Sequence, residues 1–159
     1  MSLVIRKAQK KDAAAILDFI RALAEYEKLS HEVVATVPAL EEQLFGASPK
    51  AEVLIAEWDQ QPAGFALFFH NFSTFLALPG IYLEDLFVKP ELRGHGIGKA
   101  LLKYLAQLAV ERKCGRLEWS VLDWNKPAID FYKSFGASPM DEWTVYRLTG
   151  ESLINFAKD

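Results

Sequence analysis

The sequence has little cysteine and no long apolar run. Cys114 is the only cysteine in 159 residues, so no disulfide can form within the chain, and such sparse use of cysteine is typical of reducing compartments. No apolar stretch approaches the roughly 20 residues of a membrane-spanning helix, and the N-terminal residues lack the apolar segment of a signal peptide. We therefore expect a cytoplasmic protein with no membrane partner.

The chain also lacks a basic excess and a metal-binding pattern. Its 18 Lys and Arg against 21 Asp and Glu give a net charge of −3, whereas proteins that bind nucleic-acid phosphates are usually strongly basic. The three histidines show no metal-ligand spacing, and none lies near Cys114 to act as its base. We expect no nucleic-acid partner, no metal and no covalent cysteine route, while the mild acidity suits a cationic small molecule.

What is present is the composition of one globular domain, 1–159. Hydrophobic residues make up 51% of the chain and charged residues 25%, and no repeat or linker divides it. Segments of apolar alternation and of helical periodicity follow one another, which predicts an α/β fold with a mixed sheet covered by helices. The expected strands are 3–8, 51–58, 63–72, 80–88, 116–122 and 143–148, and the expected helices are 13–26, 38–45, 97–114, 127–135 and a short one at the C-terminus.

The most informative motif is the glycine-rich segment Arg93-Gly94-His95-Gly96-Ile97-Gly98-Lys99, which lies between an apolar strand and an amphipathic helix. A glycine-rich turn at the start of a helix aims free N–H groups and the positive end of the helix dipole at one point. Glycine lets the backbone approach an anion closely, and Arg93 and Lys99 add positive charge. The motif predicts a binding site for a phosphate or pyrophosphate.

Two common glycine motifs do not fit this segment. A P-loop requires Gly where Arg93 stands and Ser or Thr where Ala100 stands. A dinucleotide-binding fingerprint requires Gly in place of Lys99 and normally follows the first strand of its domain. The form that matches is Arg-Gly-x-Gly-Ile-Gly, late in the chain and directly after an apolar strand.

That form resembles a known family. The segment from Leu86 to Gly98 is similar to the acetyl-coenzyme A motif of the GNAT N-acetyltransferase superfamily, and the segment from Asn125 to Ala137 resembles the second half of the same site. The resemblance implies a GNAT-like acyl-CoA N-acyltransferase fold, which is a twisted mixed sheet with splayed fourth and fifth strands. The pantetheine arm of acetyl-CoA lies in the gap between those strands.

The resemblance extends over nearly the whole chain to the spermidine/spermine (diamine) and thialysine N-acetyltransferase subfamily. It is carried by Leu23–Glu27, Tyr82–Val88 and Asp123-Trp124-Asn125 leading into Phe131-Tyr132-Lys133. It implies an acetyl-CoA-dependent enzyme, a small-molecule amine substrate and a homodimer.

The chemistry that such an enzyme performs needs a carboxylate near the acetyl group. Alkylamines, with a pKa near about 10.4, are protonated at neutral pH, so the attacking amine must first lose a proton to a base. Glu84 and Asp85 stand in an otherwise apolar strand just before the glycine loop, where burial of an unpaired carboxylate is costly. We expect Glu84 to be catalytic, which the resemblance also implies. Two neighbours on a strand can instead face opposite sides, so the role of Asp85 stays open.

A proton is also needed by the departing coenzyme A thiolate. Tyr132, whose phenol has an ordinary pKa near about 10, matches the tyrosine that serves as general acid in the family. The alternative is a core aromatic that packs its helix on the sheet.

Backbone N–H groups near Leu86 to Val88, left free by the splay, are candidate oxyanion donors. The resemblance implies cofactor contacts from Leu86, Phe87, Val88, Arg93, Gly94, His95, Gly96, Ile97, Gly98, Lys99, Asn125, Lys126, Pro127, Ala128 and Tyr132.

The acceptor site is predicted from the resemblance as well. Together with Glu84, its implied substrate contacts are Tyr26, Glu27, Asp85, Glu118, Trp119, Ser120 and Glu142, and the acids among them would attract a polycation. Each acid taken alone is also compatible with a solvated surface charge. Glu118 is acidic where the polyamine enzymes carry a neutral or basic residue, so the acceptor stays open between a polyamine, a diamine and a thialysine-like amine.

The sequence therefore predicts transfer of the acetyl group of acetyl-CoA to a primary amine of a small cationic substrate by direct nucleophilic attack. Two alternatives stay open. One is a protein lysine or N-terminal acetyltransferase, and the other is a non-catalytic acyl-CoA-binding module.

Overall fold

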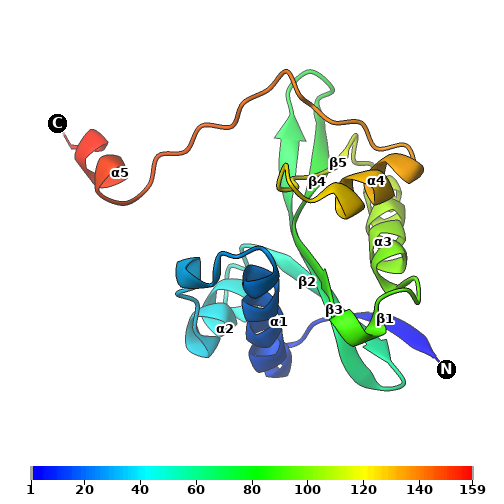
Figure 1. The fold of residues 1–159 in the computed structure, drawn as a ribbon. Helices are drawn as coiled ribbons and strands as arrows, with labels where there is room; N and C mark the ends of the chain where they lie inside the picture. Colours follow the sequence, from blue (N-terminus) through cyan, green and yellow to red (C-terminus); the bar gives the residue numbers. More distant parts are fainter. Residues whose placement is uncertain (1, 159) are drawn as a thin grey trace. The chain divides into compact units, whose positions relative to one another are not determined.

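The computed structural model describes residues 2–158, so Met1 and Asp159 of the predicted domain lie outside the described residues. The chain forms two compact units, of which the first ends at Leu122 and the second begins at Asp123. The first unit contains a five-stranded sheet in the order β1-β2-β3-β4-β5, with helices on both of its faces (Figure 1). The predicted α/β class with a mixed sheet is confirmed.

The strands agree with the apolar alternation to within a few residues, apart from the last two. They are β1 (Leu3–Lys7), β2 (Glu52–Trp58), β3 (Gln61–Ser73), β4 (Leu78–Val88) and β5 (Leu117–Trp119). Strands β1 to β4 pair antiparallel with their neighbours, and β5 pairs parallel with β4. The loop between β2 and β3 consists of Asp59 and Gln60, whose φ angles are 50° and 70°. Positive φ at both central residues is what a two-residue type I′ hairpin requires, so β2 and β3 form a hairpin.

The helices of the first unit cover the sheet from two sides. They are η1 (Lys10–Asp12), α1 (Ala13–Tyr26), η2 (Ser30–Glu32), α2 (Val37–Phe45), η3 (Pro90–Leu92) and α3 (Ile97–Glu111). Helix α1 packs on β3 and β4, and α2 packs beside it, whereas α3 lies across β2 to β5 on the opposite face (Figure 1). The second unit contains α4 (Lys126–Ser134) and α5 (Gly150–Phe156). Among the helices of the described part of the chain, none is long and apolar enough to cross a membrane.

The core follows from a sheet that is covered on both faces. Because side chains alternate between the faces of a strand, Val53 and Ile55 of β2 face α1, while Leu54 of the same strand is buried on the other face. On the α1 face, the rings of Phe19 and Phe65 stack with their centroids 5.3 Å apart. This double burial explains why β2 reads as a continuous apolar run rather than an alternating one.

The side chain of Asp12 connects the first strand with the first helical turn. Asp12 stands at the N-cap position of α1, but its carboxylate does not cap that helix. It accepts hydrogen bonds from Arg6 at 2.8 and 3.0 Å and from the Gln9 N–H at 2.7 Å. A charge-assisted bidentate bond to Arg is stronger than a neutral cap, so the side chain tethers β1 to η1 instead.

The prediction is wrong in part for the last two strands. Residues 143–148 are irregular, and β5 is shorter than the predicted 116–122. A strand forms only where its backbone groups have a ladder partner, and no strand of residues 2–158 pairs with 143–148. The alternation of Trp143, Val145 and their neighbours therefore indicates β propensity without a pairing partner.

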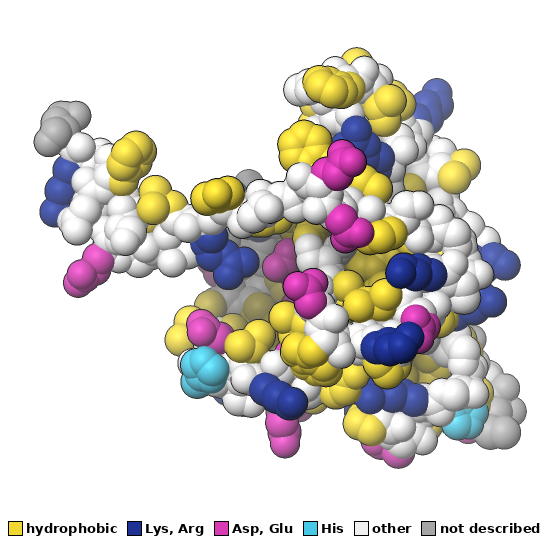
Figure 2. Space-filling view, turned by 45° about the horizontal axis from the view of Figure 1, so that its top comes forward, with side chains coloured by type: hydrophobic (Ala, Val, Ile, Leu, Met, Phe, Trp, Pro, Cys, Tyr) yellow, Lys and Arg dark blue, Asp and Glu magenta, His cyan; other side chains and the backbone are white. Residues whose placement is uncertain are grey.

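Charges of both signs are mixed on one face of the described residues. On the face drawn in Figure 2, the Lys and Arg side chains of the described residues are interspersed with Asp and Glu and form no extended basic patch. The arrangement agrees with the net charge of −3.

Candidate functional site

One edge of β4 is only partly covered. Strand β5 pairs with β4 from Ile81, opposite Leu117, to Leu83, opposite Trp119, whereas β4 continues to Val88. From Glu84 onward, β4 has no strand on this edge among the described residues. This is the separation of the fourth and fifth strands that the sequence predicts.

The backbone groups on the uncovered edge can be identified. The N–H of Lys89 donates to the carbonyl of Ala63 at 2.9 Å, on the β3 side. Successive residues of an antiparallel strand point their backbone groups to alternate edges, so the backbone groups of Leu86 and Val88 face the uncovered side. The Val88 carbonyl accepts a hydrogen bond from Nε of Arg93 at 3.0 Å. The N–H groups of Leu86 and Val88 are thus placed as donors for a ligand.

The glycine loop follows directly on this edge. Gly94 and Gly96 have φ angles of 86° and 78°, and Gly96 is the N-cap residue of α3. A Cβ at either position would meet nothing within 4 Å, so glycine is required there by the backbone angle rather than by crowding. In residues 2–158, no acceptor bonds the N–H groups from Gly94 to Lys99, and the first bond of this region runs from Ala100 N–H to Gly96 O at 2.9 Å. Such a row of unpaired N–H groups on an open surface fits a diphosphate.

The side chains of the loop make contacts that the sequence did not predict. Nδ1 of His95 lies 3.0 Å from the Leu92 carbonyl, and its ring centroid lies 5.0 Å from that of Trp58. The Arg93 guanidinium lies over the rings of Tyr26 and Phe87, at 5.1 and 5.4 Å. The sequence predicts Arg93 as a positive charge for phosphate, but in the structure its exposed side chain lies against Val88, Tyr26 and Phe87.

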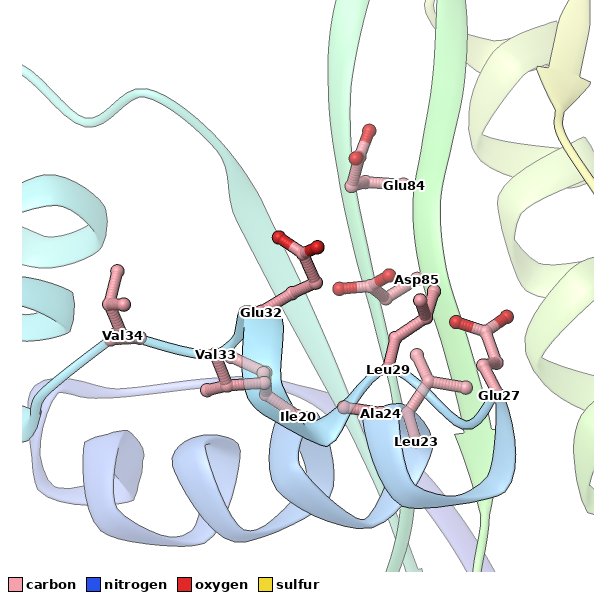
Figure 3. Close-up of a pocket in the computed structure, with 11 residues that line it drawn as sticks. Ile20, Leu23, Ala24, Glu27, Leu29, Glu32, Val33, Val34, Glu84 and Asp85 are labelled. Atoms are coloured by element: carbon pink, nitrogen blue, oxygen red, sulfur yellow. The ribbon is translucent and has the colours of Figure 1, made fainter. Parts of the chain in front are cut away.

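A pocket of about 440 Å³ lies between the end of α1, the segment around η2, and β4 (Figure 3). It brings together three predicted residues, Glu27, Glu84 and Asp85, and adds Glu32. In the view of Figure 3 the side chain of Asp85 lies between those of Glu32 and Glu27. The rest of the lining is apolar and consists of Ile20, Leu23, Ala24, Leu29, Val33, Val34 and Ala35.

A β-bulge explains how two neighbouring acids line one pocket. Leu67 of β3 pairs with Asp85, and the next residue, Phe68, pairs with Leu83, so Glu84 is an extra residue without a partner. A bulge of this kind bends the strand and redirects side chains. The expectation that two neighbours on a strand face opposite sides does not hold at this position.

The pocket has an acidic electrostatic character. Burial, and next the nearby charges of Glu84 and Glu27, raise the pKa of Asp85 from 3.8 to about 6. Burial also raises the pKa of Glu27. No lining residue is basic, so none of them neutralises the four carboxylates. A bound cation would remove part of this repulsion.

The remaining predicted residues of the first unit lie outside this pocket. The Glu118 carboxylate accepts a hydrogen bond from Nδ2 of Asn71 at 3.2 Å. The Ser120 hydroxyl lies 2.6 Å from the Tyr82 hydroxyl. Trp119 is the last residue of β5, and Tyr26 lies beneath the Arg93 guanidinium.

The second unit contains the other predicted residues. The Asn125 side chain caps α4 by accepting from the Ala128 N–H at 3.4 Å, and Pro127 occupies the first turn of that helix. Lys126 pairs with Asp130 at 2.8 Å. The Tyr132 ring packs with those of Phe131 and Phe135, at centroid distances of 5.8 and 6.3 Å. Glu142 belongs to the irregular segment before α5.

Sequence reasoning missed the wall that follows α1. Glu32, Val33 and Val34 come from η2 and an extended segment, where no periodicity marks a side chain as functional. The one signal was closeness along the chain to Tyr26 and Glu27, which the prediction already contained.

Comparison with known proteins places these features in context. Residues 16–137 match the family described as Acetyltransferase (GNAT) family. A thialysine N-epsilon-acetyltransferase of Bos taurus is 41% identical over 97% of this chain and 96% of its own length. The L-ornithine N5-acetyltransferase NATA1 of Arabidopsis thaliana is 34% identical over 94% of this chain and 85% of its own. The solved structure of an integron cassette protein, VCH_CASS6, from the mobile metagenome of V. cholerae superimposes with a TM-score of 0.83 at 32% identity, covering 100% of this chain and 99% of that one.

Proposed function

Since this chain belongs to the acetyltransferase (GNAT) family and is an N-acetyltransferase that acts on amines, we propose that it uses acetyl-CoA to acetylate a primary amine of a small cationic molecule by direct nucleophilic attack. The observation that carries the proposal is the acidic pocket at Glu84 and Asp85 of β4, where the uncovered edge that leads to the glycine loop begins. The family match crosses the boundary at Leu122, which supports one catalytic domain over 1–159.

Acetyl-CoA would be held by backbone groups more than by side chains. We assign its diphosphate to the N–H groups from Gly94 to Lys99, whose φ angles and open surroundings fit an anion. The N–H groups of Leu86 and Val88 are assigned to the acyl end, where they would stabilise developing negative charge on oxygen. When bound, acetyl-CoA supplies the thioester carbonyl that the amine attacks. On the basis of the family resemblance we also assign Phe87 beside the loop, and Asn125, Lys126, Pro127, Ala128 and Tyr132 in the second unit.

The pocket carboxylates orient the acceptor and remove its proton. An ammonium ion entering the pocket meets Glu84 at the exposed end of the acid pair and Asp85 at the half-buried end. We assign proton removal to Glu84, directly or through one water. Asp85 shares this task, because a base with a pKa of about 6 is better matched to an amine than an ordinary carboxylate.

The leaving thiolate requires a proton donor, and we assign this role to Tyr132. Its phenol is a weak acid with an ordinary pKa near about 10, and it matches the tyrosine of the family motif. Replacing Tyr132 by Phe would keep the ring packing against Phe131 and Phe135 and remove only the hydroxyl.

The acceptor class is supported by charge and by the relatives. Four carboxylates and an apolar lining suit a polyamine, a diamine or a thialysine-like amine, with one cationic group at Glu84 and a second near Glu27 and Glu32. The relatives are named for thialysine and for ornithine, both of which carry two amino groups. We assign Tyr26, Glu118, Trp119, Ser120 and Glu142 to further acceptor contacts, and we propose a cytoplasmic homodimer on the basis of the family resemblance.

The test is an amine panel with acetyl-CoA, scored by released thiol. The panel contains spermidine, a diamine, thialysine, ornithine, lysine and peptides with a free N-terminus or an internal lysine. We expect rapid turnover with the small diamines or amino acids and little with the peptides. Preferential use of peptides, or acetyl-CoA binding without thiol release on any amine, contradicts the proposal.

Matched variants connect this activity to the pocket. E84Q and E32Q each remove one pocket carboxylate, while E25Q changes an exposed residue of α1 that does not line the pocket. We expect E84Q to lower kcat at least tenfold, because it removes the proton acceptor. E32Q should raise the acceptor KM several-fold with kcat nearly unchanged, because it removes uniform binding. E25Q should resemble the wild type.

A further inference from the structure

We propose that Arg93 is a positioning residue that fixes the wall of the acceptor pocket against the glycine loop, and that it is not a phosphate ligand. The inference rests on the proposed function, because it assumes that the pocket receives the amine. Arg93 would then keep the acceptor pocket and the glycine loop at a fixed distance from one another.

The Arg93 side chain connects the segment before the glycine loop with two other elements, β4 and α1. Arg93 follows η3, and its Nε donates to the Val88 carbonyl at 3.0 Å on the uncovered edge of β4. Its guanidinium lies 5.1 Å from the ring of Tyr26, the last residue of α1, and 5.4 Å from the ring of Phe87. Arg93 therefore joins the loop, the strand edge and the end of α1.

The two rings that Arg93 contacts belong to residues that lie close along the chain to residues of the acceptor pocket. Tyr26 precedes Glu27, which lines the pocket, and Phe87 is two residues after Asp85 on the same strand. Phe87 is itself fixed in the core, where it is 4% exposed and lies 6.4 Å from the Phe19 ring. The guanidinium thus connects the Phe87 ring, which is fixed in the core, with the Tyr26 ring at the end of α1. Tyr26 is followed directly by Glu27, whose carboxylate lines the pocket.

The geometry requires arginine rather than positive charge alone. A planar guanidinium can lie on two aromatic rings while its Nε donates to a carbonyl. A lysine ammonium has the same charge, but it is a compact, strongly hydrated group that cannot make these three contacts at once. Replacement by lysine consequently separates the two possible roles.

Loss of these contacts should affect the acceptor more than acetyl-CoA. The diphosphate site consists of N–H groups whose positions are set by Gly94, Gly96 and the start of α3. The pocket wall at Glu27, in contrast, loses the link that runs from Tyr26 through Arg93 to Val88 and Phe87 of β4. Small displacements of a bound reactant reduce attack rates strongly. We therefore expect the loss of the Arg93 contacts to lower kcat/KM for the amine.

The experiment compares R93K, Y26L and the double variant with the wild type, using the best amine of the panel. Acetyl-CoA Kd is measured by calorimetry, and kcat and KM are measured for the amine. We expect R93K to lower amine kcat/KM about tenfold, the range of a cation–π contact together with a hydrogen bond, with acetyl-CoA Kd within about threefold. Y26L should show a similar loss, and the double variant should be no worse than either single one, because the residues act through one contact.

Several outcomes overturn the inference. R93K with wild-type amine kinetics overturns it, as does a rise of more than about threefold in acetyl-CoA Kd in R93K, or full additivity in the double variant. R21K, a change at an exposed arginine of α1, controls for the substitution type. If thermal unfolding shows that R93K does not fold, Y26L and Y26F test the contact from the other side. Y26F keeps the ring and should stay closer to the wild type than Y26L. A wild type that acetylates no amine refutes the proposed function instead.

Discussion

Asp85 shows at the scale of one residue how placement changes the chemistry of a carboxyl group. Its native pKa of about 6 exceeds its ordinary value of 3.8 because it is half-buried beside two other acids. The native state therefore binds this proton more tightly than the unfolded state does. By linkage, stability falls as the pH rises from 3.8 to about 6, and the full cost is present above pH 6.

The variant D85N tests this sign. It removes the ionisation, so we expect the free energy of unfolding at pH 8 to rise by about 1–3 kcal/mol, toward the lower end because water still reaches the group. At pH 3.5 the two proteins should be nearly equal. Denaturant unfolding at both pH values checks this, and a D85N that is less stable than the wild type at pH 8 contradicts the interpretation.

The same residue predicts how activity depends on pH. If Asp85 must be ionised to share proton removal, amine kcat/KM should rise through about pH 6 in the wild type, and this limb should shift or disappear in D85N. Profiles recorded at constant ionic strength provide the measurement. An identical limb in both proteins assigns it to another group.

At the scale of elements, the glycine loop depends on backbone angles. Gly96 has a φ of 78° at the N-cap of α3, whereas Gly98 lies within the helix and a Cβ there would meet only Val88 Cγ2, at 3.7 Å. A Cβ at a positive φ costs about 1–2 kcal/mol. We expect G96A to lose about that much stability and to bind acetyl-CoA at least tenfold more weakly, with a smaller loss of stability in G98A. Thermal unfolding and calorimetry measure both effects, and equal stability losses in the two variants argue against a backbone origin.

Helix α3 is held at its other end as well. Arg112, just beyond its last turn, donates to both carboxylate oxygens of Glu52 on β2, at 2.8 and 2.9 Å. The guanidinium holds the pKa of Glu52 below its ordinary value, through hydrogen bonding first. The end of the helix opposite to the glycine loop is therefore tied to the sheet, which helps keep the loop in place.

How much the sequence could predict differs between elements. The glycine loop and the first four strands follow from local patterns, because turns and alternation are encoded in neighbouring residues. The pocket wall at Glu32 and the contacts of Arg93 depend on which distant segments meet, and no periodicity records that. The strand expected at 143–148 fails for the same reason, since alternation describes propensity but not the presence of a partner.

At the scale of the whole molecule, hydrogen bonding differs sharply between the sheet and the segment before α5. Strand β3 pairs with β2 on one edge and with β4 on the other. In the described residues 138–148, in contrast, the backbone bond found is from Trp143 N–H to Met140 O at 3.1 Å. Unpaired amides exchange with solvent readily. We expect hydrogen exchange to be complete within seconds over 138–148 and slowest in β2 to β4. Slow exchange in 138–148 would show that this segment finds a partner in solution.

The extra residue in β4 changes which side chains of the strand face each layer. Leu83 pairs with Phe68, which lies under Arg112 at the end of α3. Asp85 pairs with Leu67, which packs with the core beneath α1. Odd-numbered side chains of β4 thus point to one layer before Glu84 and to the other layer after it. Without Glu84, Leu83 and Asp85 would be successive residues that still face opposite layers, so a deletion would remove the bulge and one pocket carboxylate but keep the pairing on both sides of it. Glu84 is the position in β4 at which the alternation of side chains between the two layers shifts by one residue.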